Sequence, residues 1–413
     1  MTQRFLHWMT RDGRLLYMAR MVRMFGYGFL AVILVLYLAA LGFGETRIGL
    51  LLTLTLAGDT VISLWLSTHA DRYGRRLTLL VGALLVVGAG LVFLASHTFW
   101  LLLTAATIGV ISPSGYEVGP FLAVEQAALT EAVPADHRTT AFAWYNLAGS
   151  IATAVGSLAG GGVAKFGQLA GLEALGSYRV VIAGYAVLGI ALALLFSRVT
   201  SAVEIPASAA HTARARFGLY HSKKVVLHLA GLFALDAFAG GFVIQSLLAY
   251  WFYVRFGTHE ATLGMIFFGA NLLAGISALA ASAIANRFGL VNTMVFTHLP
   301  SNLLLMVVPL MPTLPLAIVV LLLRFSISQM DVPTRQSYTM AIVRPEERSA
   351  AAGITGTART VGAAVAPVCA GVLFGSPALM SIPFYLAGGL KIVYDLLLLQ
   401  SFRTVKPPEE SPR

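Results

Sequence analysis

The stretch HADRYGRR, from His69 to Arg76, is a short charged turn that follows one long apolar run and precedes another. A weaker copy, IANRFGLV, from Ile284 to Val291, occupies the same position between apolar runs in the second half of the chain. The first copy has an acidic residue, Asp71, where the second has Asn286. A charged turn that recurs once per half indicates a chain built from two duplicated halves.

The composition excludes a soluble globular protein. Apolar residues make up 58% of the chain and charged residues 11%, with a mean hydropathy of +0.80, which leaves too little polar surface to cover a globule. We therefore predict an all-α membrane protein with about twelve transmembrane helices in two pseudo-symmetric six-helix bundles. The expected spans lie near 16–41, 47–67, 77–96, 98–131, 139–163, 178–197, 225–254, 261–285, 291–311, 314–342, 349–374 and 380–402.

The net charge of +10 reflects membrane topology and not nucleic-acid binding. Lys and Arg residues gather in alternate connections, and this asymmetry places both termini in the cytoplasm of a multi-pass protein of the inner or plasma membrane. We expect an N-terminal bundle over 1–197, a cytoplasmic linker over 198–222, a C-terminal bundle over 223–402 and a cytoplasmic tail over 403–413.

Further matches between the halves keep a near-constant offset and the same order. FGYGF, from Phe25 to Phe29, aligns with FAGGF, from Phe238 to Phe242. The turns that contain Arg138 and Arg348 also correspond. Together these matches support a duplication along the whole chain.

On these residues the chain resembles the major facilitator superfamily of transporters, over essentially its whole length. The family's loop between helices 2 and 3 is matched by Asp71, Arg72, Gly74, Arg75 and Arg76, with Ser67 in place of the leading glycine. A glycine motif of the family's antiporters is matched in helix 5 by Gly156, Gly160 and Gly161, with Ser157 where the proline belongs. The proline version occurs instead in helix 11, with Pro367 and Gly371.

The resemblance implies a conformational latch on the cytoplasmic side. Asp71 should meet the N-terminal end of helix 11 near Arg348, where exposed N–H groups and the helix dipole favour a carboxylate. The loop arginines would be held by lipid phosphates and by carboxylates such as Asp136 or Glu131. Arg138 belongs to the same cytoplasmic group of residues. The alternative is that the arginines only anchor the loop as positive-inside charges.

Ionisable residues inside the expected spans cost roughly 2.5–3.5 kcal/mol each on insertion and are functional candidates by default. The candidates for proton coupling or the substrate cavity are Arg23, Asp59, Glu117, Asp236, Arg324, Asp331 and Arg359. Because acids and bases nearly balance, we expect most of them to pair inside the bundle.

Three pairs follow from spacing or from the duplication. These are Lys391 with Asp395, Arg324 with Asp331, and Arg23 with Asp236. Each pair can also be a static contact that fixes helix packing.

Two of the acids stand out by their local sequence. Asp59 has no acidic counterpart in the second half, so we expect a lone buried carboxylate that takes up and loses protons. Glu117 lies between Pro113 and Pro120 in a segment rich in glycine, which predicts a bent, half-unwound helix at a binding site. Asp331, before Pro333, repeats this pattern in the second half.

The sequence therefore favours a secondary transporter, coupled to protons and working by alternating access, that exports a small organic compound. The alternatives are a proton-coupled importer of a nutrient or organic anion, and a transporter-like sensor that moves nothing. We expect no enzymatic activity, no cofactor and no metal site, because no nucleophile–base pair, phosphate-binding loop or metal-ligand spacing occurs. The expected partners are protons, a small-molecule substrate and the lipid bilayer, with no nucleic acid, and we expect a monomer.

Overall fold

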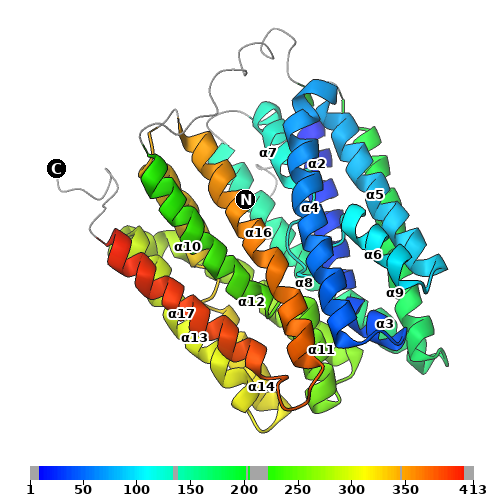
Figure 1. The fold of residues 1–413 in the computed structure, drawn as a ribbon. Helices are drawn as coiled ribbons and strands as arrows, with labels where there is room; N and C mark the ends of the chain where they lie inside the picture. The colour runs from blue at the N-terminus through cyan, green and yellow to red at the C-terminus, as the bar shows by residue number, and fades with distance from the viewer. Residues whose placement is uncertain (1–8, 134–137, 201–202, 205–221, 345–346, 404–413) are drawn as a thin grey trace. The chain divides into compact units, whose positions relative to one another are not determined.

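The computed structural model describes residues 9–133, 138–200, 203–204, 222–344 and 347–403, and all regular structure within these ranges is helical (Figure 1). In chain order the helices are α2 (Arg11–Ala31), α3 (Leu34–Ala40), α4 (Glu45–Tyr73), α5 (Arg75–Ala95), α6 (Phe99–Ile108), α7 (Phe121–Ala132), α8 (Arg138–Leu169), α9 (Ala174–Ser197), α10 (Lys223–Gly241), α11 (Gln245–Phe256), α12 (Glu260–Phe288), α13 (Leu290–Val307), the 3-10 turn η4 (Val308–Leu310), α14 (Leu314–Phe325), α15 (Asp331–Ala341), α16 (Arg348–Phe374) and α17 (Ile382–Phe402).

Most of these helices are suited to a bilayer. Within the described ranges, nine are long and apolar enough to cross it, and the bent pair α2–α3 makes a tenth if it is one span. A helix rises 1.5 Å per residue, so the apolar stretches of 21 residues or more match about 30 Å of hydrocarbon. The predicted all-α membrane class is confirmed.

Four expected spans are each divided into shorter helices. The span expected at 16–41 consists of α2 and α3, and the span expected at 225–254 consists of α10 and α11. The span expected at 98–131 consists of α6 and α7, and the span expected at 314–342 consists of α14 and α15. Between α6 and α7 the backbone turns through positive φ angles at Val110, Gly115 and Gly119, which a continuous helix does not permit. The predicted half-unwound segment around Glu117 is therefore confirmed.

The chain divides into two compact units. Unit 1 comprises Met1–Phe43, Leu54–Ala215 and Leu248–Phe268, and unit 2 comprises Gly44–Thr53, Arg216–Leu247 and Gly269–Arg413. The first turns of α4 thus pack within unit 2, whereas α11 and the first turns of α12 pack within unit 1. The sequence did not predict this exchange of two segments.

Glycines allow the helices of each unit to approach closely. In unit 1, a Cβ on Gly156 or Gly160 of α8 would collide with the backbone carbonyl of Phe25 or Phe29 of α2. In unit 2, Gly371 of α16 lies against Gly49 of α4 in the same manner. Small residues are usual at contacts between membrane helices. Within lipid the hydrophobic effect does not drive helices together, so their association depends on close van der Waals packing.

We expect Gly160→Ala to destabilise the protein by about 1–3 kcal/mol, because the added methyl group must push α2 away from α8. The matched control is Gly162→Ala on the same helix, where a Cβ meets no atom within 4 Å. The midpoint of thermal unfolding in detergent measures the difference. Equal midpoints for the two variants would show that this close approach contributes nothing to stability.

Candidate functional site

Unit 1 contains a cluster of two arginines and two glutamates, which we call the N-terminal charge cluster: Arg20, Arg23, Glu117 and Glu125. Arg20 and Arg23 each bind a different carboxylate oxygen of Glu117, and Arg23 also donates to Glu125 Oε2 at 2.5 Å. The side chains of Arg23 and Glu125 are 1% and 0% exposed. Because two permanent cations meet two carboxylates, the cluster carries no net charge when both acids are ionised.

Local structure explains how these four side chains meet. Arg20 and Arg23 are three residues apart on α2 and therefore share one face of that helix. Glu117 comes from the break between α6 and α7, and Glu125 lies one turn into α7. Tyr145 of α8 donates its hydroxyl to Glu125, and its ring lies 4.2 Å from the Arg20 guanidinium carbon.

Asp59 of α4 holds the same break from another side. Its Oδ1 accepts the backbone N–H of Gly119 at 2.6 Å and the hydroxyl of Ser63 at 3.1 Å. Gly119 has a φ of +82°, so the carboxylate fixes a turn that L side chains rarely adopt. Asp59 is buried, as predicted, and no cation among the described residues pairs with it. Its uptake and loss of protons stays a prediction.

A second cluster, the C-terminal charge cluster, surrounds Asp236 of α10 in unit 2. Asp236 accepts Lys391 of α17 on Oδ1, and on Oδ2 it accepts Arg335 of α15 at 3.3 Å and Arg359 of α16 at 3.1 Å. Asp331 binds Arg335 from one turn away at 2.8 Å. The Arg359 side chain is 34% exposed, whereas that of Asp236 is 4% exposed. Arg359 is thus the accessible edge of an otherwise buried network.

His298 of α13 extends the C-terminal charge cluster. Its Nδ1 lies 2.8 Å from Asp395 Oδ1, and its Nε2 lies 3.9 Å from Asp236 Oδ1. The amide of Asn302, one turn further along α13, donates to Asp395 Oδ2 at 2.9 Å. With neutral His298, the three carboxylates of Asp236, Asp331 and Asp395 equal the three cations of Arg335, Arg359 and Lys391.

One predicted ion pair is wrong because each of its residues finds a partner on another helix. Lys391 reaches Asp236 instead of Asp395, and Asp395 turns to His298. The predicted pair of Arg23 and Asp236 would join the two units and stays a prediction; each of these residues also has partners within its own unit. Spacing along one helix gave no information on which neighbouring helix each side chain faces.

The predicted pair of Arg324 and Asp331 is also wrong. The prediction assumed one continuous helix, but α14 ends at Phe325 and α15 begins at Asp331. The guanidinium carbon of Arg324 lies 4.7 Å from the centre of the Phe325 ring, and Asp331 binds Arg335.

The charged turn between α4 and α5 is held by a carboxylate that the sequence did not single out. Glu204 accepts the backbone N–H groups of Arg75 and Arg76 at 2.7 and 3.0 Å, so it caps α5 where the helix dipole favours an anion. The Arg75 and Arg76 side chains donate to the carbonyls of Val203 and Ser197 at 3.1 and 2.5 Å. Gly74 has a φ of +105°, which the tight turn requires.

The proposed latch itself lies largely outside the described residues. The structure does not describe Asp136, nor the side chains of Asp71, Arg72, Glu131 and Arg138. Arg348 is exposed at the start of α16 and donates to the carbonyl of Met340 at 2.9 Å. The latch stays a prediction.

Sequence reasoning missed two central residues, Arg20 and His298. Arg20 had a signal, because it lies three residues before Arg23 and shares its helix face. His298 belongs to no motif and to no metal-ligand spacing, so the sequence did not single it out. Within the described ranges, no three His, Cys, Asp or Glu residues form a group that could hold a metal ion.

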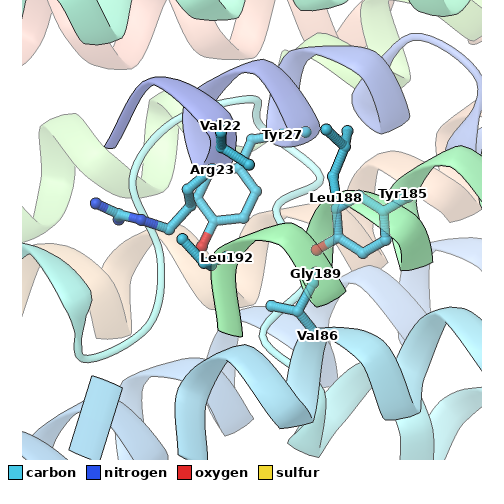
Figure 2. Close-up of a pocket in the computed structure, with 9 residues that line it drawn as sticks. Val22, Arg23, Tyr27, Val86, Tyr185, Leu188, Gly189 and Leu192 are labelled. Atoms are coloured by element: carbon cyan, nitrogen blue, oxygen red, sulfur yellow. The ribbon is translucent and has the colours of Figure 1, made fainter. Parts of the chain in front are cut away.

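A small hollow of about 10 Å³ lies beside Arg23, and this is space for about one water molecule. Tyr27 and Tyr185 line it, and the Arg23 guanidinium points away from Tyr185 (Figure 2). The Arg23 guanidinium thus points toward the glutamates, and the side of Arg23 that faces the hollow is next to the two tyrosines.

Comparison with known proteins gives matches along nearly the whole chain. The family described as Major Facilitator Superfamily matches residues 16–367 and 237–413. The chain is similar to the uncharacterized membrane protein YJR124C of Saccharomyces cerevisiae, with 30% identity over 423 residues that cover 95% of this chain and 94% of the relative.

Several solved structures have the same fold. A bacterial homolog of the human lysosomal transporter Spinster has a TM-score of 0.74 and 16% identity, covering 97% of this chain and 98% of its own. A D-xylose-proton symporter has a TM-score of 0.74 and 14% identity, with coverage of 96% and 98%. The nucleoside transporter NupG has a TM-score of 0.70 and 15% identity, with coverage of 95% and 100%. At these identities the similarity concerns the fold alone.

We expect Arg23→Gln to cost about 3–5 kcal/mol of stability, because it leaves the carboxylate of Glu125 buried without its cation. The added change Glu125→Gln should restore part of the loss. Lys224→Gln, at the exposed start of α10, is the matched control. Thermal unfolding in detergent measures all four proteins. A double variant no more stable than Arg23→Gln would refute the assigned pairing.

Proposed function

Because this multi-pass membrane protein belongs to the major facilitator superfamily of transporters, we propose that it moves a small organic compound by alternating access and couples this movement to protons. Family members are transporters and not enzymes. The coupling ion, the substrate class and the direction are the parts that we propose.

The C-terminal charge cluster carries the proposal of proton coupling. Each charge at membrane depth costs free energy, and the cluster offsets this cost by pairing every acid with a base. Adding a proton to one member unbalances the pairing and favours a different arrangement of the cations. A proton on Asp236 should change the arrangement of the cations most, because three cations share its two oxygens. Buried ionisable pairs of this kind mark proton relays in membrane transporters.

Asp59 is a second candidate for the coupling proton. It is buried and is held by hydrogen bonds from Gly119 and Ser63. Protonation would weaken the hydrogen bond that Asp59 accepts from the backbone N–H of Gly119. The turn between α6 and α7 would then be held less firmly. Glu117 lies two residues before Gly119 in that turn. A proton on Asp59 can therefore affect the N-terminal charge cluster through Glu117.

Export is the direction we prefer, on the antiporter-like glycines Gly156, Gly160 and Gly161 of α8. The second candidate is import of an organic anion. It is favoured by Arg359, which is the exposed cation of the C-terminal charge cluster and shares its only described carboxylate with two other cations. We propose the plasma or inner membrane as location, with both termini in the cytoplasm and a monomeric protein.

Proteoliposomes with a trapped pH-sensitive dye test coupling and substrate class together. Nucleosides, pentoses, organic acids and lipophilic amines are added in turn, with and without an imposed pH gradient. We expect one class to move protons, and we expect Asp236→Asn to reduce gradient-driven movement to the level of protein-free vesicles, because the cations then lose their common acceptor.

Two further variants complete this test. Glu173→Gln, at the exposed start of α9, should transport normally. An Asp59→Asn variant with full gradient-driven transport would remove Asp59 from the mechanism. Opposite movement of substrate and protons supports export, and movement in the same direction supports import. Transport that ignores the pH gradient contradicts proton coupling, and movement of no compound favours a sensor.

A further inference from the structure

His298 has both ring nitrogens directed at carboxylates inside unit 2. Nδ1 lies 2.8 Å from Asp395 Oδ1, and Nε2 lies 3.9 Å from Asp236 Oδ1. A neutral imidazole has one N–H, so only one of these nitrogens can donate. When Nδ1 donates to Asp395, the lone pair of Nε2 faces Asp236, and a proton added there creates a donor aimed at a carboxylate. The site is therefore built to accept a proton.

We propose that His298, positioned by Asp395 and Asn302, is the proton-binding site of this transporter. The inference rests on the proposed function and deepens it by naming the group that carries the proton. The site lies on α13 and α17, and not in the helix breaks that the sequence pointed to.

The surrounding charges determine what a bound proton does. The titratable and charged groups on the helices packed against α13 are Asp395, Lys391, Tyr394 and Tyr385 of α17, Asp331, Arg335 and Tyr338 of α15, and Arg324 of α14. Asp236 of α10 also faces His298, and Arg359 of α16 is joined to it through Asp236. The C-terminal charge cluster is neutral with neutral His298, so a proton gives it one positive charge in excess.

The excess charge weakens one particular contact. Protonated His298 becomes a fourth cation directed at Asp236, on the oxygen that already holds Lys391. Of the competing cations, Lys391 and Arg335 are buried, whereas Arg359 is 34% exposed and can turn to water at the least cost. Proton uptake at His298 thus releases Arg359 of α16. Coupling then consists of a proton bound on α13 and a cation set free on α16.

Asp395 and Asn302 fix the imidazole in this position. Asp395 accepts from His298 through one oxygen and from the Asn302 amide through the other, and its side chain is 0% exposed. The Tyr394 ring packs edge-on against the imidazole with 6.0 Å between ring centres. A histidine held only for packing would not need a second carboxylate in front of its other nitrogen.

Histidine-selective NMR of the purified full-length protein in detergent tests this site. The resonance missing from His298→Gln identifies His298, and the wild-type protein is then titrated between about pH 5 and pH 9, on either side of the usual histidine range. We expect the His298 resonance to titrate as one proton. We expect its midpoint in Asp395→Asn to fall by about one to three pH units, because imidazolium loses an adjacent anion.

The resonance of His228 is the matched control, and it is identified as the resonance missing from His228→Gln. His228 is an exposed histidine of α10 whose Nε2 lies 3.5 Å from Ser401 Oγ, so Asp395→Asn should leave its resonance unchanged. If His298→Gln fails to fold, the resonance that Asp395→Asn displaces identifies His298.

A His298 resonance that does not titrate, or a midpoint that Asp395→Asn leaves unchanged, overturns the proposal. Gradient-driven transport by a protein whose His298 resonance does not titrate would refute His298 as the proton-binding site and would still support proton coupling. A titrating His298 in a protein whose transport ignores pH would refute the coupling and keep the site.

Discussion

A charge at membrane depth is stable only when an opposite charge or several hydrogen-bond donors meet it, and this constraint organises both units of the protein. In unit 2 the constraint converges on Asp236, whose two oxygens meet Lys391, Arg335 and Arg359 from three other helices. In unit 1 it converges on Glu117, which meets two arginines of α2. Each unit therefore encloses a network whose charges cancel, and a single proton is enough to upset the balance.

The interrupted helices serve this arrangement. Glu117 can reach both Arg20 and Arg23 because the backbone between α6 and α7 is not helical, and Asp59 fixes that backbone at Gly119. The close packing of α2 on α8 through Gly156 and Gly160 is what brings the α2 arginines near Tyr145. Helix packing and charge compensation thus depend on each other.

The sequence predicted the helices better than the contacts. Apolar length determines where a chain can cross a bilayer, so the predicted spans overlap the described helices, although four of these spans are divided. Proline and glycine correctly placed the break near Glu117. Ion pairs depend on how each helix is rotated toward its neighbours, which spacing along one helix does not determine. Lys391 therefore met Asp236 instead of Asp395. His298 was missed because its partners come from α10 and α17, far away in sequence.

A double-mutant cycle on Asp236 and Lys391 tests most directly whether Asp236 is the charge that its network requires. Free energies of unfolding are measured in detergent for the wild type, Asp236→Asn, Lys391→Met and the combined variant. Asp236→Asn leaves three cations without their shared acceptor, so it should be strongly destabilising, and Lys391→Met should then recover part of the loss. If the two changes simply add, Lys391 and Asp236 do not interact, and the account of a compensated network around Asp236 is wrong.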